Sequence, residues 1–424
     1  MRRSRLFAGL VSIFSAATLL ACEAPKQPAP GELASSSQER ITVAAPTADL
    51  TQAVGNNTEF AVDLYKKITA QHDNVVFSPH SISVALSMTY GGAANDTAKG
   101  FEKAMHQNLP AAQFHRAMNT LDLALASRGK GAVGKDGGPF RLNVNNQLFS
   151  QSGFTLETPF LDLLATEYGA GVRLLDFETQ PEPSRVLIND WVEGNTNGLI
   201  DELLPAGSIT SDTRLTLVNT VYFNAAWKKT FDKNQTRSGA FAKLDGSTKQ
   251  VQMMSGESLS GAHGVRNGVD VVTLAYDGEE VDLVLFAPPV GSFAAFEAGL
   301  NAAEVQALVD AAHGSSVNVE MPKFDFKTRQ SLNETLSALG LAEAFSSRAD
   351  FSALRAGGGL QITDVVHEAV IKTDEAGTEA AAATGVVIGV TSVPSFVQID
   401  RPFVFAIRDR ATGALLFMGR VVDP

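Results

Sequence analysis

An uncharged stretch near the C-terminal end strongly limits the folds that this sequence can adopt. Residues 380–399 contain no charged side chain; the first half is built from small residues and the second half is rich in β-branched ones. Loops are normally polar, and an exposed strand of this composition would be prone to aggregation. In an extended chain, the even-numbered residues from Thr378 to Ile388 share one small or apolar face, which suits burial in a sheet. The stretch is therefore either a plain buried strand or a loop that can become a central strand.

The body of the chain is densely patterned from about residue 58 to 424, with no second Pro/Ser-rich linker and no internal repeat. Periodicity predicts helices over 58–69, 81–90, 111–126, 184–196, 293–300, 302–312 and 330–339. It predicts strands over 142–149, 215–223, 269–276, 281–287, 317–326 and 365–373, and a hairpin of 402–408 with 415–421. Helices and strands occur in clusters rather than in strict alternation, which favours an α+β fold.

The N-terminus is typical of an exported protein. Basic residues at the start precede an apolar run from Leu6 to Leu20, which is too short to span a membrane as a helix. The run ends in LLAC at 19–22, which resembles a bacterial lipobox, where the signal is cut before a lipidated cysteine. We expect a signal peptide over 1–21 and lipidation of Cys22, with an ordinary signal peptide as the alternative. Cys22 is the only cysteine, so an intrachain disulfide is impossible.

The segment 22–53 is rich in Pro, Ala, Ser, Gln and Thr and has few large apolar residues, which predicts a disordered, lipid-anchored linker before a domain at 54–424. Glu23 follows Cys22 where an aspartate would, by resemblance to Gram-negative lipoproteins, favour the inner membrane. We therefore expect a lipid-anchored protein of the bacterial envelope, at the outer membrane or cell surface. The protein is extracellular if the lipobox is not used.

Several function classes are disfavoured. A net charge of −12 disfavours nucleic-acid binding, because such binding needs excess positive charge to contact phosphates. The G-x-S-x-G, H-E-x-x-H and P-loop motifs are absent, and the histidines are scattered. The G-x-G-x-x-G match at 129–134 follows a predicted helix rather than a strand, so we interpret it as a flexible loop. No metal, no cofactor and no conventional enzyme activity are expected.

Four blocks of the sequence resemble one family, the serpins, in the right order. They are NVVFSPHSIS at 74–83, LVNTVYFNAAW at 217–227, HEAVIKTDEAGTEAA at 367–381, and RPFVF, LFMGR and DP at 401–405, 416–420 and 423–424. The resemblance covers about 58 to 424. It implies an α+β serpin fold: a large mixed main sheet, two further sheets, eight to nine helices and an exposed reactive-centre loop at about 375–400.

The resemblance also implies a suicide-substrate inhibitor of proteases. The target's nucleophile attacks a bond in the loop, and the loop then inserts into the main sheet and traps the acyl-enzyme. Insertion needs small residues at the hinge, because bulk would block opening of the sheet. The matching hinge residues are Glu375, Gly377, Thr378, Glu379, Ala380, Ala381, Ala382 and Ala383. The alternative is a non-inhibitory serpin that acts as a protease substrate or binding protein.

The scissile bond follows from two spacings of the family pattern. Counting forward from Glu375 and back from Arg401 gives Thr391–Ser392, and a slip of one residue gives Val390–Thr391. Either bond offers a small or β-branched side chain, which favours elastase-like or subtilisin-like serine proteases as partners. Papain-like cysteine proteases remain an alternative.

Two further parts of the family pattern, the shutter and the breach, belong to the main sheet. Ser78, Ser81, Asn219 and His367 match the shutter, a polar cluster under the centre of the sheet. Trp227 matches the breach, where the loop first enters. We expect a monomer.

Overall fold

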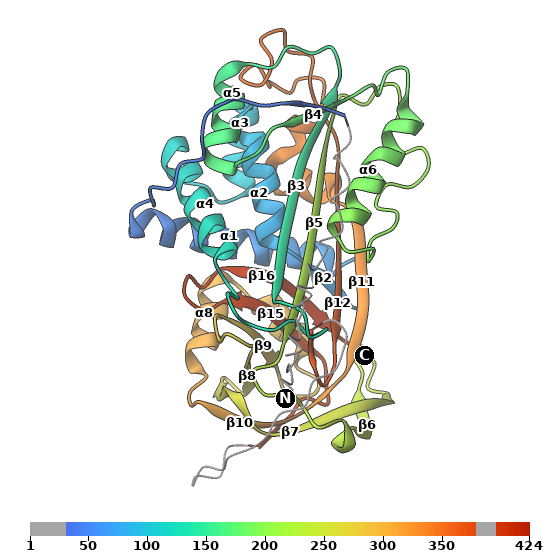
Figure 1. Cartoon of the computed structure of the whole chain (residues 1–424). Helices are drawn as coiled ribbons and strands as arrows, with labels where there is room; N and C mark the ends of the chain where they lie inside the picture. The colour runs from blue at the N-terminus through green and yellow to red at the C-terminus, as the bar shows by residue number, and fades with distance from the viewer. Residues whose placement is uncertain (1–30, 379–395) are drawn as a thin grey trace, which may run out of the picture.

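The structure is a computed structural model that describes residues 31–378 and 396–424. In these residues the chain forms nine helices: α1 (Thr47–Ile68), α2 (Pro79–Tyr90), α3 (Asn95–Ala104), α4 (Ala111–Ala126), α5 (Thr158–Leu163), α6 (Pro181–Asn195), α7 (Phe293–Gly299), α8 (Ala302–Ala311) and α9 (Asn333–Leu336). Helices α1 to α5 gather at one end of the molecule, beside the long strands (Figure 1). The expected α+β fold is confirmed.

The main sheet has seven strands of mixed direction. Their order is β1 (Glu32–Ala34), β4 (Val172–Leu175), β3 (Arg141–Gln151), β5 (Leu215–Ala226), β13 (Gly377–Thr378), β12 (Ile362–Thr373) and β11 (Phe324–Ser331). β5 pairs parallel with β12 over part of its length, whereas β3 pairs antiparallel with β5. The short β13 lies between β5 and β12 at one end of both strands.

Both faces of the main sheet are covered, so its central strands β5 and β12 are mostly buried. Successive side chains point to opposite faces. Val218 of β5 and Val366 of β12 belong to the same buried cluster as Ile188 of α6. The preceding residue on β5, Leu217, belongs instead to the large core that contains Ile82 of α2. The sheet is therefore held between α6 on one side and the α1–α2 layer on the other.

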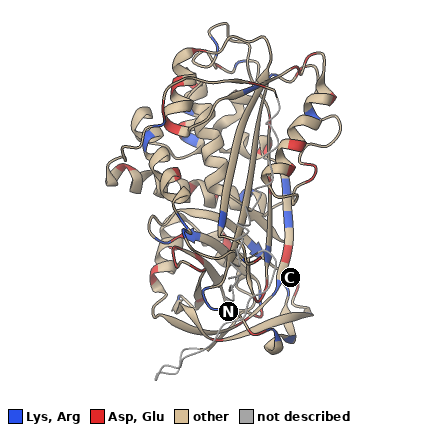
Figure 2. Ribbon diagram, viewed as in Figure 1, with Lys and Arg blue, Asp and Glu red and all other residues tan. Residues whose placement is uncertain are grey.

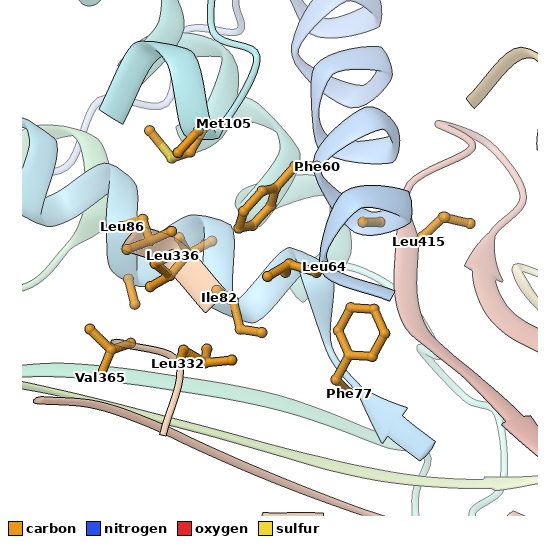
Figure 3. Close-up of a cluster of buried hydrophobic side chains, with 14 of the residues drawn as sticks. Phe60, Leu64, Phe77, Ile82, Leu86, Met105, Leu332, Leu336, Val365 and Leu415 are labelled. Atoms are coloured by element: carbon orange, nitrogen blue, oxygen red, sulfur yellow. The ribbon is translucent and has the colours of Figure 1, made fainter. Parts of the chain in front are cut away.

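The large core lies between the helices and the inner face of the main sheet (Figure 3). Phe60 and Leu64 lie one turn apart on α1 and point toward Phe77 and Ile82, at the entry to α2 and within it. All four side chains are almost completely buried. The apolar stripe of α1 therefore fixes this helix against the segment that leads into α2.

The remaining strands form one nine-stranded sheet. Along it lie β14 (Phe396–Gln398), β10 (Ser316–Pro322), β7 (Thr248–Arg266), β8 (Val269–Ala275), β9 (Val281–Ala287), β15 (Phe403–Asp409), β16 (Leu415–Val421) and β2 (Val75–Phe77), with β6 (Arg237–Ala242) paired to β7. These strands correspond to the two further sheets that were expected, one with β6 and β10 and the other with β8, β9, β15, β16 and β2. They are joined because β7, with 19 residues, is long enough to pair with β6 and β10 at one end and with β8 at the other.

Two expected elements differ in the structure. The single strand expected over 317–326 is two strands in two sheets, with the change at Lys323 between β10 and β11. The helix expected over 330–339 is wrong at its start, because β11 continues to Ser331 and pairs with β12. Only α9 follows, and its continuation is interrupted at Gly340, where φ is +130°.

The N-terminal segment also differs from expectation, because residues 31–53 of the expected disordered linker are packed on the body. We call residues 31–46 the N-terminal strap. β1 extends the main sheet by pairing with β4, and α1 already begins at Thr47. Arg40 donates hydrogen bonds to Asp122 at 2.6 Å and to Asn119 at 2.8 Å. Backbone pairing and polar side-chain contacts hold the strap. Its lack of large apolar residues suggested disorder because these contacts leave no apolar pattern in the sequence.

Within the described ranges, no helix combines the length and the apolar character that crossing a membrane requires.

Candidate functional site

The four predicted shutter residues lie together under the centre of the main sheet. The backbone N–H of Ser78 donates to Nε2 of His367 at 3.1 Å, and Nδ1 of His367 lies 2.6 Å from Oδ1 of Asn219. The amide nitrogen of Asn219 donates to Ser81 and to Asn146. Ser78 also caps α2, because its hydroxyl accepts from the backbone N–H of Ser81 at 3.2 Å. The chain of bonds thus joins three strands of the sheet to the first turn of α2.

These contacts define the protonation state of His367. Nε2 accepts from a backbone N–H, so Nδ1 carries the proton and donates to Asn219. A second proton would have to sit on Nε2, facing another donor. Burial lowers the pKa of His367 to about 3, so the ring is neutral at ordinary pH.

Asn146 belongs to this cluster and was missed by the sequence analysis. It lies on β3 directly opposite Asn219 of β5, and its side-chain oxygen accepts from Asn219. The available signal was the pair Asn145-Asn146 in the middle of a strand that becomes apolar and buried farther along.

Trp227 lies at the end of the sheet where β13 enters. Its backbone N–H donates to the carbonyl of Ala376 at 3.0 Å, and its indole Nε1 donates to the carbonyl of Asp374 at 2.8 Å. The ring stacks on Tyr276 at a centroid distance of 4.7 Å. The hydroxyl of Tyr276 in turn lies 2.7 Å from the hydroxyl of Thr378. Trp227 and Tyr276 therefore hold the segment 374–378 from two sides.

Two of the hinge residues, Gly377 and Thr378, already occupy a strand position in the main sheet. Gly377 and Thr378 are opposite Ala226 and Ala225 of β5, and Thr378 is also opposite Thr373 of β12. Gly377 has a φ of +154°, and a Cβ at this position would lie 2.1 Å from the carbonyl oxygen of Ala225. Glycine is thus required for this backbone to enter between the two strands.

Glu375 precedes this strand and is almost completely buried. Lys323 lies 2.6 Å from its carboxylate, and the hydroxyl of Thr236 donates to it at 2.5 Å. Burial acts to raise the pKa of Glu375, but the bonds from Lys323 and Thr236 outweigh burial and the pKa lies below its usual value. The carboxylate is therefore charged and fixed beside the entry point. Lys323 and Thr236 were not identified from the sequence.

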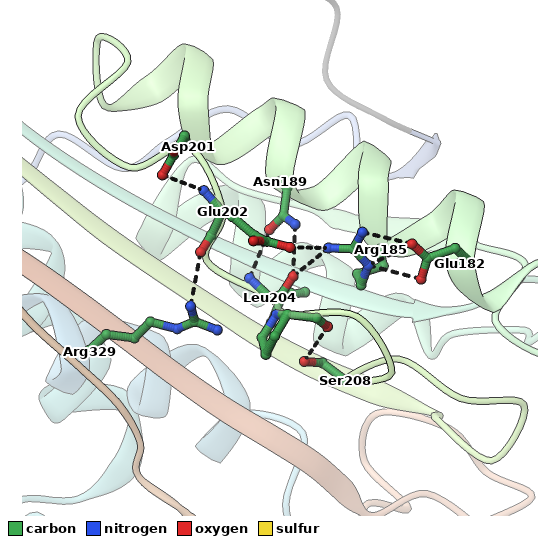
Figure 4. A network of polar contacts seen from close by, with 9 residues as sticks. Glu182, Arg185, Asn189, Asp201, Glu202, Leu204, Ser208 and Arg329 are labelled. Atoms are coloured by element: carbon green, nitrogen blue, oxygen red, sulfur yellow. Dashed lines mark hydrogen bonds and ion pairs between the residues drawn. The ribbon is translucent and has the colours of Figure 1, made fainter.

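Helix α6 is held over the outer face of the main sheet by a polar network (Figure 4). Arg185 of α6 forms an ion pair with Glu182 at 2.7 Å and with Glu202 at 3.1 Å, and donates to the carbonyl of Leu204 at 2.6 Å. Asn189 both donates to and accepts from the backbone of Leu204. The helix and the segment that follows it form one rigid cover.

The same network reaches the edge of the main sheet. Arg329 of β11 donates to the carbonyl of Glu202 at 3.2 Å, which ties the cover of α6 to the last strand (Figure 4). Along β11, charges of both signs follow one another (Figure 2). Lys327 pairs with Glu368 at 3.4 Å, and Asp325 pairs with Lys372 at 3.3 Å. This edge carries matched charges rather than a basic patch.

Several expected site residues lie outside the described residues. These are Cys22, Glu379, Ala380, Ala381, Ala382, Ala383, Val390, Thr391 and Ser392. Among the described residues, no group of three or more His, Cys, Asp or Glu side chains could hold a metal ion.

The arrangement of the site is thus a mixed main sheet with a polar cluster beneath its centre and with Gly377 and Thr378 paired between two of its central strands. The serpin (serine protease inhibitor) family model matches residues 55–424. The chain belongs to the serpin family, whose members include protease inhibitors.

Relatives and solved structures agree with this. An uncharacterised serpin-like protein of Thermococcus kodakarensis is 34% identical over 370 residues, which is 86% of this chain and 84% of the relative. The leukocyte elastase inhibitor of Bos taurus is 33% identical, over 87% of this chain and 98% of the inhibitor. The native state of tengpin, a thermophilic serpin, has a TM-score of 0.81 at 27% identity and covers 93% of this chain and 100% of tengpin.

Proposed function

We propose that this serpin is a suicide-substrate inhibitor of serine proteases. The target protease attacks the loop and forms an acyl-enzyme. Before this ester is hydrolysed, the loop inserts between β5 and β12 and carries the protease with it. Each new ladder hydrogen bond contributes about 1 kcal/mol, and burial of the apolar face of the loop adds to the driving force.

One observation carries the proposal. Gly377 and Thr378 are already paired between β5 and β12, so the position that an inserted strand needs exists at this end of the sheet. The residues that follow are small and uncharged from Ala380 to Ala383, which favours continued insertion. A bulky or charged run at these positions would oppose it.

Elastase-like or subtilisin-like proteases are the proposed targets. The proposed scissile bond is Thr391–Ser392, with Val390–Thr391 as the alternative, and neither offers a basic side chain to the primary pocket. The similarity to a leukocyte elastase inhibitor supports the same class of target. Cross-class inhibition of papain-like cysteine proteases is the second candidate.

Incubation with an elastase and with subtilisin tests the proposal. We expect a complex that survives SDS, and release of a C-terminal peptide that begins at Ser392. We also expect the melting temperature of the loop-cleaved protein to rise sharply, because the inserted strand completes the sheet. Stoichiometric cleavage without a complex, and with an unchanged melting temperature, would identify a substrate or binding serpin instead.

We further propose that the protein is exported and anchored to the bacterial envelope by a lipid on Cys22. The motif at 19–22 and the single cysteine support this. Metabolic labelling with palmitate should mark the wild type and leave Cys22→Ser unlabelled. An unlabelled wild type that is secreted would point to an ordinary signal peptide.

A further inference from the structure

The loop between α4 and β3 reaches across the end of the main sheet. This 127–140 loop contains the glycine-rich segment that the sequence analysis interpreted as flexible. In the structure its backbone is fixed on both sheets. The N–H of Gly129 donates to Glu280 at 2.7 Å, and the N–H of Val133 donates to Asp277 at 2.9 Å. The carbonyl of Val133 accepts from Ala226 at the end of β5, at 3.1 Å.

Lys135 of this loop has a completely buried side chain. Its backbone N–H donates to the side-chain oxygen of Asn224 on β5 at 2.7 Å, which aims the residue into the sheet. Its ammonium lies 2.9 Å from Asp374 and 3.4 Å from the carbonyl of Lys372. Burying a lysine is costly unless its charge is paired, so the contact with Asp374 is a specific one.

Asp374 is the corner of the turn that starts the inserted strand. Its backbone N–H donates to the carbonyl of Gly377 at 3.0 Å, and its carboxylate accepts from the N–H of Ala376 at 2.9 Å. Its carbonyl accepts from the indole of Trp227. The turn reverses the chain from β12 into β13. Any further loop residue that enters the sheet extends β13, so its position in the sheet depends on this turn.

We propose that Lys135 is a positioning residue for loop insertion: its ammonium holds the Asp374–Gly377 turn in the conformation from which the inserted strand grows. This rests on the proposed inhibitory function. Without Lys135, Asp374 loses its ion pair at the start of the turn, and the hinge withdraws from the sheet more often. Insertion then starts later, and more of the acyl-enzyme is hydrolysed before it is trapped.

The first test needs no protease. The chain has two tryptophans, and in a Trp191→Phe background the emission of Trp227 reports on the turn, since its indole bonds to Asp374. Lys135→Met should shift this emission to longer wavelength as the indole becomes hydrated. The control is Lys130→Met, which removes an exposed lysine from the same loop. Equal spectra for the two variants would overturn the proposal.

The second test measures how many moles of serpin are needed to inactivate one mole of elastase or subtilisin. The loss of one charge-assisted bond shifts the balance between inserted and withdrawn hinge by about tenfold. We therefore expect this stoichiometry to rise several-fold for Lys135→Met and to stay at the wild-type value for Lys130→Met. Wild-type stoichiometry for Lys135→Met would overturn the role in insertion.

Asp374→Asn breaks the same ion pair from its other side and leaves the buried ammonium of Lys135 without a counter-charge. The double variant with Lys135→Met removes both charges and therefore guards against a variant that merely misfolds. Asparagine can still accept from Ala376, so it keeps the turn and loses only the charge. We expect it to raise the stoichiometry as Lys135→Met does, and the double variant should be no worse than either single one. Additive effects would show that Lys135 acts elsewhere.

Failure of the proposed function has a separate signature. If the wild type forms no complex with any protease, inhibition is wrong, and the emission test still decides whether Lys135 holds the turn. A shift confined to Lys135→Met then supports that role, and its absence overturns it.

Discussion

Nε2 of His367 accepts a hydrogen bond from the backbone N–H of Ser78 at 3.1 Å, and this contact joins β12 to the first turn of α2. Only the neutral ring can make it. Protonation would place a second donor against Ser78 and a charge in a fully buried site. The centre of the main sheet is therefore sensitive to acid.

The first prediction is a loss of stability below neutral pH. The pKa of His367 is lowered by burial to about 3, whereas an unfolded histidine has a value of about 6.5. Between these values the unfolded chain binds more protons, so the free energy of unfolding falls as the pH falls, by up to about 1.4 kcal/mol per pH unit. Urea midpoints measured from pH 7 to pH 5 should decrease accordingly.

His367→Asn provides the matched comparison. The variant should be less stable at pH 7 and should lose less stability on acidification. Part of the slope remains, because burial also lowers the pKa of His80 and that of His115. Identical slopes for wild type and variant would show that His367 does not titrate as described.

The second prediction concerns Thr378, which is buried between β5 and β12. Thr378→Arg places a charged, bulky side chain where the loop enters, so the protein should change from inhibitor to substrate. Gel analysis should show cleavage of the loop at the wild-type rate and no SDS-resistant complex. Thr248→Arg, at an exposed position of β7, should inhibit normally. Persistent complex formation by Thr378→Arg would argue against insertion at this point.

The third prediction concerns Gly377. A methyl group at Gly377→Ala would collide with the carbonyl oxygen of Ala225, so β13 cannot keep its present pairing. We expect a higher stoichiometry of inhibition, and a Trp227 emission like that of Lys135→Met. Gly194→Ala, where a Cβ meets nothing within 4 Å, is the control. If both variants match the wild type, the close approach at Gly377 has no role in insertion.

The fourth prediction concerns the N-terminal strap. Arg40→Ala removes the bonds to Asp122 and Asn119 and should lower the free energy of unfolding by about 1–2 kcal/mol. Arg348→Ala removes an exposed arginine and should change it by less than about 0.5 kcal/mol. Equal urea midpoints for the two variants would mean that the strap adds no stability.

The periodicity of neighbouring residues was enough to predict an element when the boundaries of that element coincide with a change in periodicity. The helix 111–126 and the strand 281–287 have the expected bounds. The change of sheet at Lys323 could not be found in this way, because this one residue separates two strands of alternating polar and apolar residues, and the partners of β10 and β11 are distant in sequence. The helix expected over 330–339 failed for the same reason, since pairing of Gln330 with His367 extends β11.

For the site, the family pattern located Ser78, Ser81, Asn219 and His367, and the structure brings them together. It did not indicate Lys135. Glycines around this residue suggested a flexible loop, and its partner Asp374 lies far along the chain. Contacts made by single side chains across the fold leave no periodic trace in a sequence.

The placement of β1 has a consequence for how the molecule would stand on a membrane. β1 extends β4 at the top of Figure 1, whereas β14, which follows the loop, pairs with β10 near the bottom. Residues 22–31 can span at most about 3.6 Å each. With a lipid on Cys22 as proposed, a connection of this length would keep the end of the molecule that carries β1 near the bilayer. β14, the first described strand after the loop, would then lie at the end of the molecule away from the bilayer (Figure 1).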